Sequence, residues 1–269
     1  MKLTNARVII TGSIVEVYFY PEKELSYSYH SPKKRDCGSN TENKEVDIEA
    51  KLKSRLTSES RSKSNLKRLI NTNAHISNNP FKPVFGTFTF KENIQDLKIA
   101  NKIFSKFLKR LNYFVGDGVK KSFLKYVVVP EFQKRGAVHY HAIFFNLKFI
   151  QIDILAKIWD QGFIFFKKID HIKNVGSYIS KYLCKEVGDE RTNRHKRYFS
   201  SRNLNRPIVI KNKETCSWVL SYLKKEYRVY KKEIQSEYHG KVIYAQFNLE
   251  NSGYETSLIK RMAGLYEND

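Results

Sequence analysis

Two histidines one residue apart are the clearest chemical feature of the chain. The stretch GAVHYHAIFF, residues 136–145, places His139 and His141 inside an otherwise apolar run. Such a run predicts a β-strand, in which alternate side chains share a face, so the two imidazoles lie close enough to share one cation. Because a lone pair of histidines is more often structural, a third ligand is needed before the pattern indicates a metal site.

The hairpin before this strand supplies a candidate third ligand. The KRG sequence at 134–136 fits a three-residue loop whose glycine takes the positive φ. Counting back from that loop pairs His139 with Glu131 on the same face. Two imidazoles and one carboxylate with open coordination positions form the ligand set of a catalytic divalent site, so we predict that Glu131, His139 and His141 bind a metal.

The metal and the register stay open at this point. The carboxylate favours Mg²⁺ or Mn²⁺ when the substrate is a phosphate, but imidazoles also suit Zn²⁺. A bulge at Pro130 would shift the pairing by one residue and take Glu131 off the histidine face.

A second constellation lies in NVGSYISKYLCKEV, residues 174–187, which has helical spacing. Beside its apolar stripe, a second stripe with i, i+3, i+4, i+7 spacing carries Tyr178, Lys181, Tyr182 and Lys185. A tyrosine hydroxyl has a pKa of about 10 and needs a cation or a base nearby to act as a nucleophile. A lysine one turn away can favour the phenolate or protonate a leaving oxygen. The structural alternative is that both tyrosines border the core while the lysines reach water.

The surrounding periodicity predicts the elements that must position these groups. We expect strands over 84–90, 123–132, 137–146 and 163–169, and helices over 96–113 and 153–160, the second closed by Gly162. The order βαββαβ predicts an α+β fold with a central antiparallel sheet and helices on one face, in a ferredoxin-like or RRM-like layout followed by the tyrosine-bearing helix.

The flanking regions read differently from this core. They predict a hairpin over 6–20 broken at Gly12 and Ser13, a mobile linker over 26–45, a basic helix over 59–73, a turn-rich basic segment over 196–207, a helix over 214–227 and a last strand over 242–249. We therefore expect three regions: 1–57 as hairpin and basic linker, 58–210 as the catalytic domain, and 211–269 as a carboxyl-terminal extension.

The charge points to a polyanionic partner, because 49 Lys and Arg against 27 Asp and Glu leave a net charge of +22. The 17 Tyr and 18 Phe would suit stacking on unpaired bases. Candidate DNA-backbone contacts, for which a merely solvated face is the alternative, are Arg61, Lys63, Lys67, Arg68, Lys134, Arg135, Arg197 and Arg202.

The same composition argues against several other classes. No run of about 18 apolar residues and no signal-like stretch is present, so we expect a cytoplasmic protein without membrane contact. The three cysteines, Cys37, Cys184 and Cys216, form no CxxC pair and are expected to be reduced thiols. No GxxxxGK[ST] phosphate loop is found, which argues against ATP-driven activity.

Taken together, PEFQKRGAVHYH and VGSYISKYLCKE resemble the motifs of the HUH endonucleases, most closely the rolling-circle replication initiators of small single-stranded DNA phages and plasmids. VFGTFTF (84–90) resembles the first strand motif of that family, and YISKYLCK its YxxKYxxK nucleophile motif. The resemblance covers residues 59–205. It implies that Glu131, His139 and His141 bind Mg²⁺ or Mn²⁺.

The resemblance also implies an activity and partners. A tyrosine, Tyr182 first and Tyr178 as its partner or substitute, would cut one strand at an origin stem-loop, keep a 5′-phosphotyrosine link and leave a 3′-OH. Lys181 and Lys185 would support acid–base or phosphate roles. A host helicase and DNA polymerase would be partners, and the bacterial cytoplasm the compartment.

Three rival readings stay open. An HUH transposase or a conjugative relaxase would share the chemistry, although relaxases usually resemble a three-histidine site and the transposases are typically shorter. A ferredoxin-like nucleic-acid binding protein without catalysis would explain the charge and the aromatic residues. It would not explain why metal-type ligands and Tyr/Lys pairs occur together.

Overall fold

The computed structural model of the 269-residue chain describes residues 3–22, 25–26, 48–74, 81–119, 122–169, 195–236 and 238–249, together with Gly176 and Arg191. These residues form two compact units. One unit is continuous in sequence and contains residues 62–206, and the other combines residues 1–61 with residues 207–269. No helix in the described ranges has the length and apolarity to cross a membrane.

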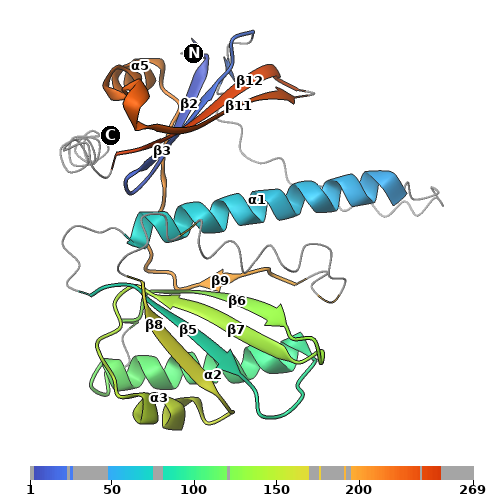
Figure 1. The fold of residues 1–269 in the computed structure, drawn as a ribbon, viewed down its shortest axis with the longest axis vertical. Helices are drawn as coiled ribbons and strands as arrows, with labels where there is room; N and C mark the ends of the chain where they lie inside the picture. The colour runs from blue at the N-terminus through green and yellow to red at the C-terminus, as the bar shows by residue number, and fades with distance from the viewer. Residues whose placement is uncertain are drawn as a thin grey trace. The chain divides into compact units, whose positions relative to one another are not determined.

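The unit at 62–206 is built on a five-stranded antiparallel sheet (Figure 1). Its order is β8 (Ile164–Lys168), β5 (Val84–Thr89), β7 (Val138–Phe144), β6 (Tyr126–Phe132) and β9 (Phe199–Ser200). Since each strand is antiparallel to its neighbours, β5 and β6 run parallel on either side of β7. Along the chain the elements follow as β5, α2, β6, β7, α3 and β8, which confirms the predicted βαββαβ order.

Helices α2 (Leu97–Val115) and α3 (Ile152–Trp159) cover one face of this sheet (Figure 1). The side chain of Asp96 caps α2 by accepting hydrogen bonds from the backbone N–H groups of Lys98 and Ile99. The core on this face is strongly aromatic, with Phe88, Phe90, Phe104, Phe107, Tyr140 and Trp159 all fully buried. Burial of that many rings accounts for much of the hydrophobic stabilisation of the unit.

The end of α3 differs from the prediction. The helix is closed by Asp160, which adopts the left-handed conformation at φ 52°, and not by Gly162. Gly162 is needed for a different reason, because a Cβ atom there would lie 2.5 Å from the backbone nitrogen of Lys91 and 2.5 Å from the carbonyl oxygen of Thr89. The glycine lets the chain pass close to the end of β5 before β8 begins.

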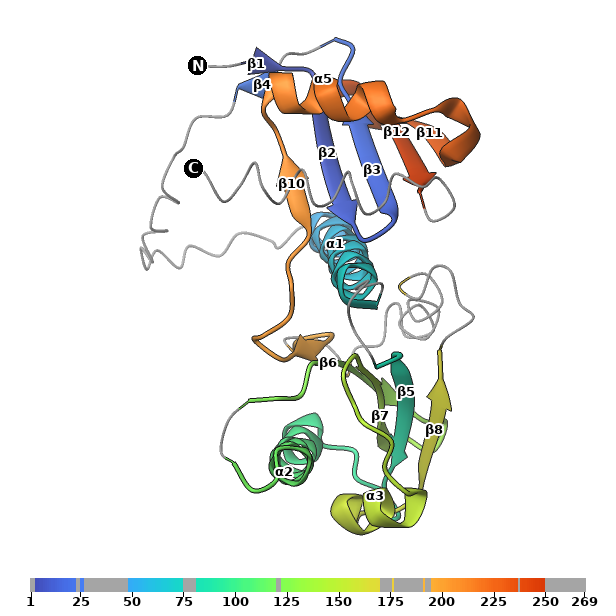
Figure 2. The same cartoon turned by 90° about the vertical axis from the view of Figure 1, so that its left-hand side faces the viewer.

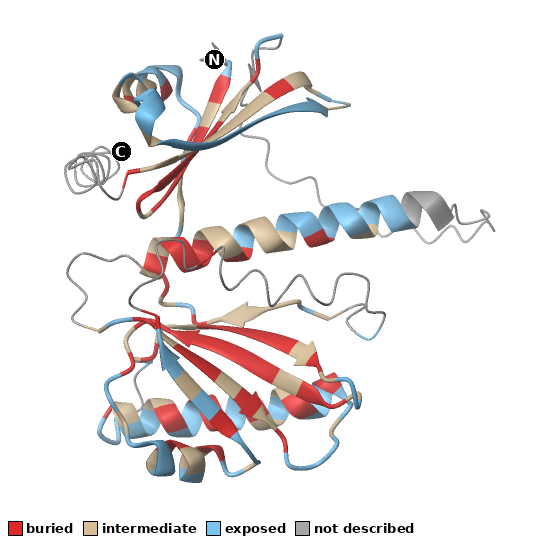
Figure 3. Cartoon of the chain, viewed as in Figure 1, coloured by how far each residue is buried: buried red, intermediate tan, exposed pale blue. Residues whose placement is uncertain are grey.

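The opposite face of the same sheet is partly covered by the carboxyl-terminal half of α1 (Ile48–Ala74). The basic helix predicted over 59–73 is thus confirmed, and it begins earlier than expected. Its apolar stripe of Leu66, Leu69 and Ile70 is buried against residues of the strands, including Phe85 and Ile143. The strands at the centre of the sheet are accordingly buried along much of their length (Figure 3).

The second unit is also a five-stranded antiparallel sheet. Its order is β10 (Ile208–Ile210), β2 (Ala6–Thr11), β3 (Ile14–Phe19), β12 (Gly240–Asn248) and β11 (Arg228–Ser236). Helix α5 (Lys213–Tyr222) packs on it, with Cys216 and Val219 buried among strand residues (Figure 2). A short pair, β1 (Leu3–Thr4) with β4 (Leu25–Ser26), completes this unit.

The outer predictions are mostly confirmed. The hairpin over 6–20 forms as β2 and β3, with Gly12 at a positive φ of 64°, and the last strand forms as β12. The helix expected over 214–227 ends at Tyr222 and is followed by a single 3₁₀ turn, η2 (Lys225–Tyr227). Cys216 is a free, buried thiol. The linker predicted over 26–45 lies outside the described residues apart from Ser26 in β4, as do Cys37 and Cys184.

Candidate metal centre

The β6–β7 hairpin has the register that the sequence predicts. Glu131 pairs with His139 and Phe132 with Val138, without a register shift along the ladder. The loop closes with the N–H of Gln133 donating to the carbonyl of Ala137 across 2.8 Å, and Gly136 takes a positive φ of 86°. Pro130 therefore introduces no bulge, and Glu131 stays on the histidine face.

Three ligand atoms converge on this face of the sheet. The Nε2 atom of His141 lies 2.5 Å from Oε2 of Glu131, and the Nε2 atom of His139 lies 3.5 Å from the same oxygen. The two Nε2 atoms are 2.9 Å apart. Among the described residues, this is the one group of three or more His, Cys, Asp or Glu side chains whose ligand atoms lie within 4.8 Å of one another.

The donor set fits a divalent cation. A single proton can satisfy one pair of these three atoms at a time, whereas a cation accepts the lone pairs of all three at once. Two neutral imidazoles and a carboxylate are ligands for several divalent metals, and three protein ligands leave positions for substrate oxygens. The cluster can therefore hold a metal ion, and the ligand types alone do not select which one.

A second layer of side chains orients the imidazoles. The hydroxyl of Thr87, on the neighbouring strand β5, lies 3.2 Å from Nδ1 of His141, and the amide of Gln133 lies 3.4 Å from Nδ1 of His139. The ring of Phe85 stacks on that of His141, with centroids 5.3 Å apart. Contacts to Nδ1 leave Nε2 directed at the centre, which is the usual arrangement around a metal-binding histidine.

Sequence reasoning did not find this second layer. Thr87 and Phe85 lie in the strand motif at 84–90, but their role depends on β5 pairing with β7, which places Thr87 opposite His141. The signal was present in the alternation of VFGTFTF, whose residues 85, 87 and 89 share one face.

The electrostatics keep Glu131 ionised. Burial alone raises the pKa of this carboxyl, but hydrogen bonds from His139 and His141 and the positive charge of their protonated rings outweigh that effect and lower the pKa to about 2. The carboxylate is thus present as an anionic ligand throughout the neutral range.

Tyr140, between the two histidines in sequence, lies on the other face of the sheet. Its ring is fully buried in the aromatic core, and its hydroxyl donates a hydrogen bond to Oδ1 of Asn101 across 2.7 Å. Burial raises the pKa of the Tyr140 phenol far above its ordinary value. Tyr140 is therefore a core residue and not a nucleophile.

The four candidate nucleophile and lysine positions, Tyr178, Lys181, Tyr182 and Lys185, lie outside the described residues. Gly176, two residues before Tyr178, is described and helical. Its backbone N–H donates to Oδ1 of Asn71 on α1 across 2.8 Å, and a Cβ atom at this position would overlap the backbone carbonyl of Lys67. Helix α1 thus fixes the chain just before the predicted tyrosines, on the side of the sheet that carries the histidines.

The candidate DNA contacts are placed as follows. Arg61, Lys63, Lys67 and Arg68 lie along α1, with Arg61 exposed and the others half-buried. Lys134 and Arg135 are exposed at the hairpin tip, Arg197 is half-buried just before β9, and Arg202 is exposed just after it. Arg135 also has structural contacts, donating to the carbonyl of Phe90 and to Oε1 of Gln133.

Comparison with known proteins gives one match. A family model for a replication-associated protein of the ORF2 type matches residues 83–187, the segment from β5 through the metal cluster to the predicted tyrosine motif. This match supports a Rep-like, replication-associated protein. No curated protein matches the chain, and no solved structure does.

Proposed function

We propose that the chain is a rolling-circle replication initiator of the HUH type, which nicks and rejoins single-stranded DNA at its origin. The observation that carries the proposal is the convergence of Glu131, His139 and His141 on one face of the sheet, within the segment that matches a replication-associated family. The sheet order β8-β5-β7-β6, with β5 and β6 parallel, is the order expected of a ferredoxin-like core and supports the same assignment.

In the proposed reaction, a tyrosine oxygen of Tyr182 or Tyr178 attacks the phosphorus of one phosphodiester. The bond from phosphorus to the 3′ oxygen breaks, a 5′-phosphotyrosine forms, and the proton lost by the tyrosine is balanced by one gained at the leaving 3′ oxygen. Lys181 and Lys185 are placed in sequence to assist that proton exchange. Attack by a 3′-OH on the phosphotyrosine reverses these steps and rejoins the strand.

The metal cluster supports this chemistry. Glu131, His139 and His141 would hold Mg²⁺ or Mn²⁺, which polarises the scissile phosphate and offsets developing negative charge. Thr87 and Gln133 keep the two imidazoles in the orientation that the cation requires. The partners of this activity would be an origin stem-loop, a host helicase and a DNA polymerase in the bacterial cytoplasm.

The proposal is tested by covalent capture. The purified protein is mixed with a randomised single-stranded oligonucleotide library in Mn²⁺, and protein–DNA adducts that survive denaturing electrophoresis are sequenced. We expect adducts enriched in one sequence, abolished by His139→Ala and by the double change Tyr178→Phe/Tyr182→Phe. The single tyrosine variants rank the two nucleophiles. Tyr113→Phe, which alters an exposed tyrosine of α2, is the matched control and should leave the adduct unchanged.

The outcomes separate the rival functions. An adduct that persists in the double tyrosine variant would sink the tyrosine assignment. Tight DNA binding with no adduct in any metal would instead support a nucleic-acid binding protein without catalysis. Loss of both binding and adduct in His139→Ala would indicate that the histidine maintains the fold, because DNA affinity rests chiefly on phosphate contacts.

A further inference from the structure

The edge strand β8 carries exposed aromatic rings in line with the metal cluster. Phe165 pairs with Thr87, and Thr87 pairs with His141 on its other side, so these three residues form one row across the sheet. Because paired residues of an antiparallel sheet share a face, the ring of Phe165 lies on the histidine face. Two strand spacings of about 4.8 Å put it on the order of 10 Å from His141.

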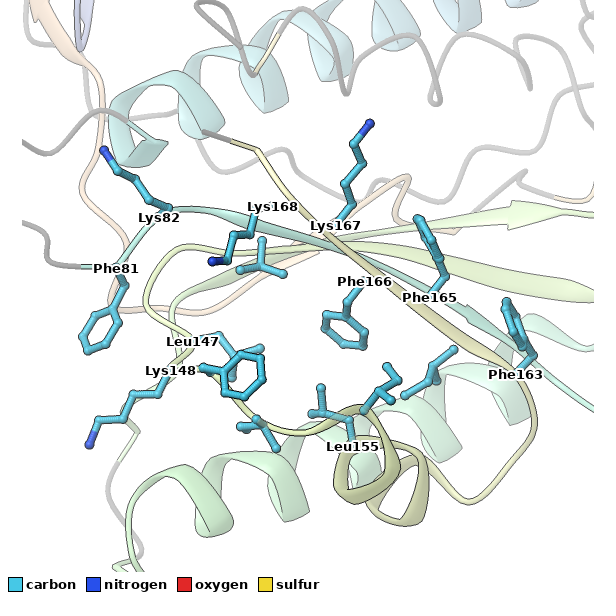
Figure 4. Close-up of a pocket in the computed structure, with 15 residues that line it drawn as sticks. Phe81, Lys82, Leu147, Lys148, Leu155, Phe163, Phe165, Phe166, Lys167 and Lys168 are labelled. Carbon is cyan, nitrogen blue, oxygen red and sulfur yellow. The ribbon is translucent and has the colours of Figure 1, made fainter. Parts of the chain in front are cut away.

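A second row runs beside the first. The carbonyl oxygen of Phe163 accepts a hydrogen bond from the N–H of Thr89 across 2.8 Å, and Thr89 pairs with His139. Phe163 thus stands on the same face as Phe165, with Lys167 following two residues further on. The close-up shows Phe163, Phe165 and Lys167 pointing to one side of β8 and Phe166 to the other (Figure 4).

These rings are unusually exposed for large apolar side chains. Phe163 is 67% exposed and Phe165 is 49% exposed, although other phenylalanines of this unit are fully buried. They border a groove of about 790 Å³ along β8 (Figure 4). Exposed aromatic residues of this kind, gathered at one edge, indicate a surface that binds something.

The charges around the groove indicate what it binds. Within the described part of the chain, the groove is lined by four lysines and by no acidic side chain: the lysines are Lys82, Lys148, Lys167 and Lys168. A surface that pairs flat rings with lysines matches unpaired bases, which stack on aromatic faces, and the phosphates that link them. An apolar peptide or a second copy of this chain would not need the lysines.

We propose that the β8 groove binds single-stranded DNA, with unpaired bases stacked on Phe163 and Phe165 and phosphates contacted by the surrounding lysines. The proposal rests on the proposed nicking function, since it places the groove on the strand that leads to the bond cut at the metal cluster. The sheet rows then measure the path: the bases next to the scissile phosphate cross β5 and meet the rings at the edge.

The first test is equilibrium binding of fluorescein-labelled oligo(dT) in EDTA, followed by anisotropy. Stacking contributes about 1–3 kcal/mol per base, so Phe163→Leu/Phe165→Leu should weaken binding by roughly tenfold or more. Phe163→Trp keeps a stacking surface and should retain the affinity. Phe114→Leu is the matched control, because Phe114 is 46% exposed but lies on α2 in the helical layer, and it should bind as the wild type does.

A second measurement separates rings from charge. An abasic oligonucleotide keeps the phosphates and lacks the bases, so the wild type and the double variant should bind it equally weakly. Lys167→Gln/Lys168→Gln should lower the salt dependence of oligo(dT) binding, by about 0.7 in the logarithmic slope for each phosphate that is no longer neutralised. Thermal unfolding of each variant checks that the fold is kept; should the double variant unfold, Phe163→Ser, at the more exposed position, replaces it.

The outcomes distinguish this proposal from the proposed function. Unchanged oligo(dT) affinity in the double variant would overturn the groove, whether or not the wild type forms adducts. Ring-dependent binding by a protein that never forms an adduct would support the groove and contradict the nicking function. A wild-type dimer that dissociates in the double variant, with DNA affinity unchanged, would overturn the proposal in favour of a second copy as the occupant.

Discussion

The amide oxygen of Asn71 accepts a hydrogen bond from the backbone N–H of Gly176 across 2.8 Å, joining α1 to a residue 105 positions later in the chain. Asn71 is only 2% exposed, and Gly176 is buried as well. At the other end of the predicted tyrosine segment, the guanidinium of Arg191 lies 4.2 Å from the ring centroid of Phe132, the residue after Glu131. Both anchors belong to elements that also support the metal cluster.

Removing the Asn71 anchor should lower both stability and DNA cleavage. Asn71→Ala leaves the buried N–H of Gly176 without this acceptor, which costs about 1–3 kcal/mol in the free energy of unfolding. Urea unfolding and adduct formation are measured together. Asn65→Ala, at an exposed position of the same helix, is the control and should change neither. Equal effects of the two variants would show that the anchor is unimportant.

Divalent cations should stabilise the protein through the three-ligand cluster. A ligand bound only to the folded state at about 100 times its Kd adds about 2.7 kcal/mol, so Mn²⁺ should raise Tm relative to EDTA. Glu131→Gln removes the anionic ligand and should abolish most of that rise. Glu92→Gln, which neutralises an exposed carboxylate, should keep it. Calorimetry with and without Mn²⁺ gives the result, and an undiminished rise in Glu131→Gln would place the cation elsewhere.

Alkaline pH should reveal the buried phenol of Tyr140. Its folded pKa is raised by burial above the ordinary value of about 10, so above that pH the unfolded state loses a proton that the folded state keeps. The contribution of this group is complete below pH 10 and declines as the pH rises. The stability difference between wild type and Tyr140→Phe, about 1 kcal/mol from the hydrogen bond to Asn101, should therefore shrink above pH 10.

Urea unfolding across the alkaline range measures that difference. Tyr113→Phe, at an exposed position, should show the same pH dependence as the wild type. A constant difference between wild type and Tyr140→Phe at all pH values would mean that Tyr140 titrates normally in the folded protein.

The two cationic residues of the hairpin loop should behave differently. Arg135→Ala removes donors to the carbonyl of Phe90 and to Gln133, the amide beside His139, so it should destabilise the protein by about 1–2 kcal/mol. Lys134→Ala alters an exposed neighbour and should affect only DNA affinity, with a lower salt dependence. Unfolding and anisotropy experiments compare the two. Equal stability of both variants would argue against a structural role for Arg135.

The metal cluster could be predicted because its determinants are local. A three-residue loop with a glycine at its last position fixes the register of a hairpin, so the pairing of Glu131 with His139 follows from counting residues. The alternation around Phe85 and the helical spacing of α2 likewise reflect the two backbone periods directly. The tyrosine motif stays a prediction, since Tyr178 and Tyr182 lie outside the described residues.

Long-range pairing could not be predicted in the same way. Nothing in Ile208–Ile210 or Gly240–Asn248 identifies β2 and β3 as partners, because strand pairing over such separations leaves no local signal. The exposure of Phe163 and Phe165 was also missed. An alternating strand predicts which residues share a face, but only the sheet order shows that β8 lies at an edge.

The sheet that combines β2 and β3 with β10 and β12 has a consequence for synthesis on the ribosome. The hairpin of β2 and β3 is translated before residues 62–206, yet its two flanking strands emerge only after that whole unit has been made. The metal-bearing unit can therefore fold while the hairpin still waits with both edges open. In a growing chain, the sheet that is begun before the metal-bearing unit is finished only after it.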